Sequence, residues 1–330
     1  MIRTFLVTAL FSTILIGQQP SSFRWYKGNT HTHTLNSDGD STPDEVVKWY
    51  RDNGYNFLVM TDHEFITPVE PLNFAYGKAG DFLVISGQEV TDRTDGKPHH
   101  VNALGIASVT QPKRGNASLE NIQANVDAIR SLGGVPQINH PNFGWALTSE
   151  TIARTKNVML FELYNAHPQV NNLGGGDSPS TEEIWDRVLT AGRIIYGVAS
   201  DDVHTVRKLG NRKEPTPGHG WVMVRASELT PKAILQALDN GDFYASTGVE
   251  LSEFATDSRS VTIKVKEERW SKYRIQFIGK GGKLLQEFAS SSAVYKIKGN
   301  EGYVRAKVFE SNGNLAWTQP VVIQVRKGSK

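Results

Sequence analysis

The sequence predicts an α/β protein in which a parallel sheet or barrel precedes a small antiparallel β-sandwich. Short apolar runs alternate with helical patterns from Trp25 to about Gly248, which is typical of βα units. Past Leu251 the runs become short and alternating, with Gly, Ser and Asn between them and no helical pattern. A chain of 330 residues is long enough for one large domain and a smaller one.

The apolar runs and their boundaries predict the elements of the first part. Strands are expected at residues 56–61, 82–86, 135–139, 158–163, 194–200 and 221–225. Helices are expected from Thr42 to Gly54, from Leu119 to Gly133 and from Thr230 to Gly241. Thr42 can cap the first helix, because Pro43 and two acidic residues follow it in the first turn.

The alternating runs after Leu251 predict the sandwich. They are "SVTIKVK", "YRIQFIG", "AVYKIKG", "YVRAKVF" and "QPVVIQV". We therefore expect a barrel over residues 23–250 and a β-sandwich domain over residues 251–330.

The composition limits the classes of partner. The hydrophobic fraction is 38%, the charged fraction is 21% and the formal net charge is +2. A charge this close to zero gives no reason to expect a nucleic-acid polymer or an anionic membrane as the main partner. The chain has no cysteine, which excludes disulfides, thiolate ligands and cysteine nucleophiles. Any metal must be held by nitrogen and oxygen atoms.

The first 22 residues resemble a secretory signal peptide. Arg3 precedes an apolar stretch from Phe5 to Ile16, and a polar stretch follows Gly17. The apolar stretch is short for a bilayer span, and no cysteine is present that could carry a lipid. We expect residues 1–22 to be removed and the protein to be exported, to the periplasm or the extracellular space, without a membrane anchor.

Histidines and carboxylates follow the predicted strands directly. The stretch "GNTHTHTLNSDGD" sets His31 and His33 two residues apart, so that both share one face of a strand. Other apolar runs end on "TDHE", "GQE", "NHP" and "SDDVH". The carboxyl ends of the strands of a βα barrel form one rim, where we expect these side chains to converge. With Asp38, and with His100 in "GKPHHVNALGI", the set comprises His31, His33, Asp38, His63, Glu89, His100, His140, Asp201 and His204.

This set of nine predicts a metal centre. Six imidazoles gathered without metal would repel one another when protonated and would be hard to satisfy when buried. Imidazole and carboxylate suit zinc, iron or manganese. Nine ligands are too many for one ion, so we expect two or three divalent metal ions with one bridging carboxylate.

The motifs "HTHTLNSDG", "LVMTDHE", "ISGQE", "HHVNALG", "QINHP" and "ASDDVH" occur in an order that resembles the PHP (polymerase and histidinol phosphatase) superfamily. The resemblance covers residues 25 to about 250. The phrases "WYKGNTHTHT", "HHVNALG" and "ASDDVH" are most similar to its exported branch that includes carbaryl hydrolases. The resemblance implies the PHP fold, a distorted seven-stranded (β/α) barrel with a trinuclear site at the strand ends.

The resemblance also implies how the ligands are shared. One metal would take His31, His33, Glu89 and Asp201; the second Glu89, His100 and His140; the third Asp38, His63 and His204. His100 is favoured over His99 by the match to "H-x-N-x-L-G", and Asn36 stands where family members often have an aromatic residue. Asp62 is expected to orient a neighbouring ligand, whereas Asp202 and His219 are interpreted as ordinary loop residues.

The chemistry expected of such a centre is hydrolysis by a metal-bridging hydroxide. Asp201 would take up the proton of the attacking water and pass it to the leaving group. Asn165, His167 and Lys27 are candidates for substrate contact. The substrate is expected to be a small, anionic molecule, and the oligomeric state is left open.

Three functions remain open at this point. A phosphoesterase acting on a phosphomonoester or nucleotide is favoured, since three cations can neutralise phosphate and the basic run at 207–213 could attract it. A carbamate, ester or amide hydrolase is the alternative, favoured by the carbaryl-hydrolase resemblance and by Phe143, Trp145, Tyr164 and Trp221. An exported binding protein without catalysis is disfavoured, because none of the nine ligands is missing.

Overall fold

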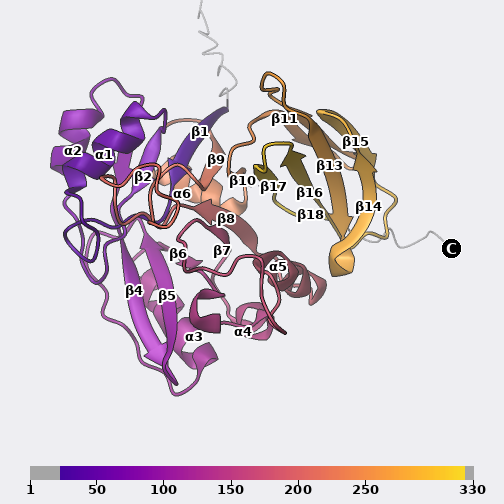
Figure 1. Ribbon diagram of the computed structural model, residues 1–330. Coiled ribbons are helices and arrows are strands. Elements are labelled where there is room, and N and C mark those ends of the chain that lie inside the picture. The colour runs from indigo at the N-terminus through magenta and orange to yellow at the C-terminus, as the bar shows by residue number, and fades with distance from the viewer. Residues whose placement is uncertain (1–22, 324–330) are drawn as a thin grey trace, which may run out of the picture.

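The computed structural model describes residues 23–323 and shows a mixed α/β protein with several sheets (Figure 1). The predicted signal peptide lies outside the described residues. Within residues 23–323, no helix has the length and apolar character needed to cross a membrane.

The first part alternates strands and helices, as predicted, except that β3, β4 and β5 follow one another without a helix. Its elements are β1 (Arg24–Asn29), α1 (Pro43–Asp52), β2 (Phe57–Val59), α2 (Glu70–Tyr76), β3 (Leu83–Ile85), β4 (Gly87–Thr94), β5 (Lys97–Leu104), α3 (Ser118–Ser131), β6 (Val135–Ile138), η1 (Phe143–Trp145), α4 (Ser149–Arg154), β7 (Leu160–Asn165), α5 (Thr181–Thr190), β8 (Tyr196–Ser200), β9 (Trp221–Ala226), α6 (Pro231–Asn240) and β10 (Phe243–Ser246). Thr42 caps α1 in a capping box with Glu45, as the sequence indicates.

These strands are divided between two sheets. Strands β1, β2 and β3 pair in parallel in one sheet, and β6, β7 and β8 pair in parallel in another, which the β4–β5 hairpin extends. Only Ser86 separates β3 from β4, and isolated bridges join Thr32 to Val203 and His63 to Glu89. Those bridges bring the carboxyl ends of the two sheets together. A single seven-stranded ring of hydrogen-bonded strands is not confirmed by this pairing.

The C-terminal part consists mainly of short strands, drawn in orange and yellow in Figure 1. The strands are β11 (Leu251–Thr256), β12 (Ser260–Val265), β13 (Tyr273–Gly279), β14 (Lys283–Phe288), β15 (Ser292–Lys296), β16 (Tyr303–Glu310), β17 (Leu315–Thr318) and β18 (Val321–Val322), and the short 3-10 helix η2 (Lys280–Gly282) joins β13 to β14. Strands β11, β12 and β15 form a three-stranded sheet. Its Ile263 shares a hydrophobic core with Phe277 and Val308 of β13 and β16.

The largest sheet spans the predicted domain boundary at residue 250. Strand β10 pairs with β9 on one side and with β17 on the other, so the order runs β14-β13-β16-β17-β10-β9-β1-β2-β3. A separate β-sandwich is therefore not confirmed, although the strands expected after Leu251 are present. The division into two domains stays a prediction.

Polar side chains fasten the C-terminal strands to the first part. The buried guanidinium of Arg305 on β16 donates to both carboxylate oxygens of Asp186 on α5, at 2.9 and 2.7 Å. Gln319 exchanges two hydrogen bonds of 2.9 Å with the backbone of Gly197 on β8. These contacts hold α5 and β8 in place. The loop before α5 and the loop after β8 carry residues of the candidate site.

Candidate metal centre

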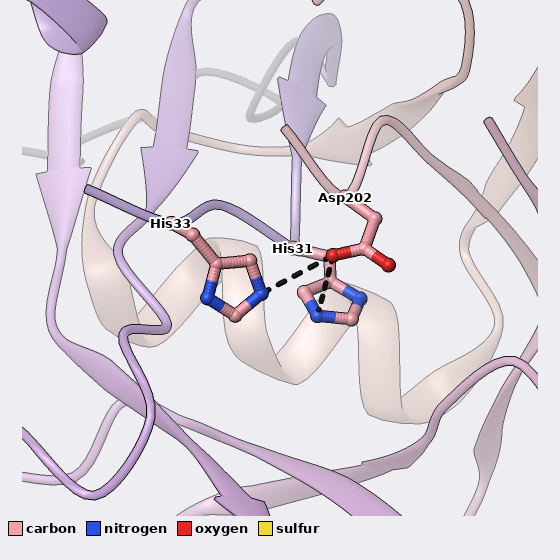
Figure 2. A group of neighbouring side chains, drawn as sticks. All are labelled: His31, His33 and Asp202. Carbon is pink, nitrogen blue, oxygen red and sulfur yellow. Dashed lines mark ion pairs between the residues drawn. The ribbon is translucent and has the colours of Figure 1, made fainter. Parts of the chain in front are cut away.

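His31, His33 and Asp202 converge at the carboxyl ends of β1 and β8, and all three are buried (Figure 2). Oδ1 of Asp202 lies 3.2 Å from Nε2 of each histidine. Oε2 of Glu89, from β4, lies 3.2 Å from the same two nitrogen atoms. Each of these two nitrogen atoms therefore lies close to two carboxylate oxygens.

These donors fit a divalent cation. Nε2 of His31 and Nε2 of His33 are buried and have no hydrogen-bond partner, although carboxylate oxygens lie close to both. Imidazole nitrogen and carboxylate oxygen are ligands that zinc and similar divalent cations accept. Buried polar atoms without partners are costly unless a ligand satisfies them. The arrangement therefore suits a metal ion held by His31, His33, Glu89 and Asp202.

Glu89 faces a second group through its other oxygen. Its Oε1 lies 3.0 Å from Nδ1 of His100 and 3.3 Å from Nε2 of His140. Asn139 donates to the same oxygen at 2.7 Å. Oε2 of Glu89 thus faces His31 and His33, and also His63 at 3.3 Å, while its Oε1 faces His100 and His140, an arrangement that suits a bridging carboxylate. His99, the alternative to His100, lies opposite Asp92 in the β4–β5 hairpin and does not line the cavity.

A third group surrounds Asp38. Nδ1 of His33 and Nε2 of His204 lie 3.4 Å from its Oδ1, and Nε2 of His63 lies 3.5 Å from its Oδ2. The carboxylate of Asp38 is the most exposed member of the centre, with 54% of its side chain accessible. Buried Asp62 shapes the loop that carries it, accepting hydrogen bonds from Thr34 and Ser37. Asp62 therefore orients this ligand loop, as expected.

The structure corrects one predicted ligand, since Asp202 and not Asp201 faces the other ligands. Asp201 is buried on the opposite side, where its oxygens accept hydrogen bonds from five donors. These are Asn29 Nδ2, Tyr50 Oη and the backbone N–H groups of Gly218, His219 and Gly220. Ser200 contacts Glu162 on the side of the centre, so the next residue along the strand faces away. Asp202 turns back because its φ is +50°. The catalytic role predicted for Asp201 is wrong for the same reason.

Sequence reasoning missed a buried carboxylate behind the ligands. Oε1 of Glu162 on β7 lies 2.7 Å from Nδ1 of His31, and its Oε2 accepts from the backbone N–H of His140 at 2.6 Å. A carboxylate on the far nitrogen of a metal-binding histidine fixes its tautomer and ring orientation. The available signal was a glutamate inside the apolar run "MLFELYN".

The predicted substrate-contacting residues lie in three different environments. Asn165 is buried, and its amide nitrogen donates to Glu162 at 2.8 Å and to Oδ2 of Asp202 at 3.0 Å, so it positions the centre and does not line the cavity. Lys27 lies over the rings of Tyr55 and Trp221, with Nζ 4.2 and 4.0 Å from their centroids, outside the cavity. These two predictions are corrected. His167 does line the cavity.

A small cavity of about 150 Å³ opens onto the ligands. Ligands from all three groups line it, together with Phe143, His167, Gln169 and Val170. Nδ1 of His167 accepts from the backbone N–H of Gln169 at 3.2 Å, which leaves Nε2 as the nitrogen that carries the proton in the neutral ring. Among residues 23–323, no lysine or arginine lines this cavity.

The charges of the centre perturb one another strongly. Burial opposes protonation of His31, but Asp202, Glu89 and Glu162 outweigh it and raise the pKa of that imidazole well above its usual value. Burial favours the neutral form of Glu89, but His31 and His100 outweigh it and hold its pKa well below the usual range. Without metal, the centre therefore retains protons on histidine that a cation must displace.

The comparisons with known proteins bear on the fold. No protein-family model and no curated protein matches the sequence. Among solved structures, the chain is similar to a two-domain protein from Bacteroides vulgatus ATCC 8482 that contains a predicted PHP-like metal-dependent phosphoesterase. The TM-score is 0.53 and the identity 16%, over 96% of this chain and 100% of that chain. The chain has a PHP-like fold.

A second similar structure is an amidohydrolase from Chromobacterium violaceum with bound sulfate and no metal. It has a TM-score of 0.39 and 16% identity, over 57% of this chain and 93% of that chain. The shared fold is the one that the resemblance implies, whereas membership of the superfamily and of its carbaryl-hydrolase branch stays a prediction. In this PHP-like chain the histidines and carboxylates that could hold a metal ion lie near the strand ends.

Proposed function

We propose that this protein is a metal-dependent hydrolase with two or three divalent cations, and that its substrates are small phosphoesters. The observation that carries the proposal is Glu89, whose two oxygens face separate groups of histidines. Phosphomonoesters or nucleotides are the substrates that we favour, and zinc, iron and manganese all suit these ligands. The solved structure from Bacteroides vulgatus, whose fold this chain shares, contains a predicted phosphoesterase, which supports the same class.

The side chains of the centre have different proposed roles, which depend on their positions. Glu89 and Asp202 supply negative charge, and the unpartnered Nε2 atoms of His31 and His33 supply lone pairs. When bound, divalent cations would lower the pKa of a coordinated water and neutralise phosphate charge. Asp202, in place of Asp201, is the carboxylate that we propose exchanges a proton with water or leaving group, because it lines the cavity.

The alternative substrate class is a carbamate, ester or amide. One feature favours it: the part of the cavity wall that does not bind metal includes Phe143 and Val170 and, within the described residues, no cationic side chain. Export to the periplasm or extracellular space, a barrel-plus-sandwich architecture and the absence of a polymeric nucleic-acid partner remain our wider proposals, supported by the sequence.

A substrate panel tests the proposal. The mature protein, loaded with zinc, iron(II) or manganese, is assayed with p-nitrophenyl phosphate and an aryl carbamate, beside Glu89→Gln and the surface control Glu150→Gln. Phosphate release that Glu89→Gln abolishes and Glu150→Gln retains supports the phosphoesterase. Carbamate turnover alone supports the alternative, and no turnover with any metal contradicts both.

A further inference from the structure

The cavity has one aromatic wall that the metal centre does not require. Phe143 follows β6 in the turn η1, and its ring lies 5.2 Å from the ring of His140 and 6.4 Å from that of His100, at steep angles of 76° and 54°. Phe143 is half-buried and lines the cavity. Its contacts with the histidines leave part of the ring surface accessible to a bound molecule.

The turn that presents this ring is strained. Gly144 and Trp145 are consecutive residues with φ of +58° and +53°, and a left-handed conformation is unfavourable for a residue as bulky as tryptophan. Glycine suits position 144 for a second reason, since a Cβ there would lie only 3.1 Å from Cδ of Pro98. Strain of this kind persists where the surroundings hold the backbone in place, which is frequent at ligand-binding sites.

The turn is tied to the loop that forms the opposite wall. Nδ2 of Asn142 donates to the backbone carbonyls of Asn171 and Pro179, both at 2.9 Å. That loop, between β7 and α5, contributes His167, Gln169 and Val170 to the cavity. Phe143 and Val170 therefore belong to two linked loops, and the apolar part of the cavity is formed before a ligand binds.

We propose that Phe143 is a specificity-determining residue that contacts the organic group of the substrate and selects an aromatic one. This inference rests on the proposed function, which places the reacting group at the metal ligands. An organic group attached there meets Phe143 and Val170, and among residues 23–323 the polar neighbours outside the ligand set are Gln169 and His167. Aromatic rings gain from edge-to-face or offset packing beyond the area they bury. The substrate class is therefore an ester with a benzyl, aryl or heteroaromatic group next to the reacting bond.

Two phosphomonoesters with leaving alcohols of similar acidity test this selection. We would compare kcat/KM for benzyl phosphate and ethyl phosphate in the wild type, Phe143→Leu and Phe143→Tyr. The difference in intrinsic reactivity between the two esters is the same for every variant. A change in the benzyl-to-ethyl ratio of kcat/KM between variants therefore measures the contribution of residue 143. We expect Phe143→Leu to reduce that preference about three- to tenfold and Phe143→Tyr to retain it. Phe74→Leu, which changes an exposed aromatic residue of α2, should leave it unaltered.

Binding of non-hydrolysable ligands separates this inference from the proposed function. Calorimetry with metal-loaded protein would compare benzylphosphonate and ethylphosphonate, with metal content measured for each variant. An aromatic preference that Phe143→Leu removes at unchanged metal content supports the proposal, even if no phosphate is released. Hydrolysis with equal loss for both esters in Phe143→Leu overturns it while leaving the phosphoesterase intact. Failure of both phosphonates to bind overturns it together with the phosphate-directed function.

Discussion

Oε1 of Glu162 lies 2.7 Å from Nδ1 of His31, and neither side chain is exposed. The carboxylate accepts the proton of Nδ1, so Nε2, which faces Glu89 and Asp202, is the nitrogen available to a cation that displaces its proton. Glu162, which does not line the cavity, thus determines the orientation of the His31 ring.

Replacing Glu162 should therefore weaken metal binding. We predict that Glu162→Gln lowers affinity for zinc or manganese by about 10- to 100-fold, because an outer carboxylate orients the ligand and makes it more basic. Competition with a coloured chelator measures this. Glu183→Gln, which alters an exposed capping residue of α5, is the matched control. Equal affinity in the two variants would show that Glu162 has no such role.

Asparagine substitutions at Asp201 and Asp202 should have different effects. Asp202→Asn removes a negatively charged carboxylate from the cavity, so turnover should fall by about 10²- to 10⁴-fold with little change in the unfolding free energy. Asp201→Asn places an amide among five hydrogen-bond donors, and the unfolding free energy should fall by about 1–3 kcal/mol. Steady-state kinetics and urea denaturation distinguish them. Loss of metal from Asp201→Asn alone would refute the corrected assignment.

The sequence could predict the ligand residues because histidines and carboxylates follow apolar strands, where the topology brings them together. It could not separate Asp201 from Asp202. Both follow the same strand, and the choice depends on the positive φ of Asp202 and on the backbone donors at 218–220, which come from a distant loop. Glu162 was missed because its partners His31 and His140 lie far from it in the chain.

The limits of the fold prediction have a similar origin. Helix α1 could be predicted, because its capping residues are local. The pairing of β10 with β17 could not, since it joins Ala245 to Trp317, and no local pattern specifies which strand edges meet. That one pairing decides whether the C-terminal strands form a separate sheet.

The metal-free and metal-bound proteins should respond to pH in opposite directions. Burial lowers the pKa of His63, but Glu89 and Asp38 outweigh it, so the net pKa is raised. The folded state then binds this proton more tightly than the unfolded state does. The stabilisation is complete below the usual histidine pKa of about 6.5 and is lost as pH rises through the raised value.

Thermal unfolding at about pH 6 and about pH 8 checks this prediction. Chelator-treated protein should melt at a higher temperature at the lower pH. Metal-loaded protein should show the reverse, because cations bind deprotonated imidazole. The same pH trend in both forms would be inconsistent with protons and metal competing for these histidines.

Breaking the Arg305–Asp186 pair should destabilise the fold without altering the chemistry. Arg305→Met leaves the largely buried carboxylate of Asp186 without its cation, which should cost about 3–5 kcal/mol of unfolding free energy. The double variant Arg305→Met/Asp186→Leu should recover part of that loss. Denaturant unfolding measures both, and kcat/KM of the folded fraction should stay near wild type. A variant that unfolds like the wild type would show that this pair does not fasten the C-terminal strands.

The central claim is that Glu89 joins two metal groups, and counting ions tests it most directly. Plasma emission on purified, metal-loaded wild type, Glu89→Gln and Glu150→Gln would give the number of ions per chain. We expect two to three ions in the wild type and in Glu150→Gln, and a loss of more than one ion in Glu89→Gln. Less than one tightly held ion in the wild type, or an unchanged count in Glu89→Gln, would contradict the account.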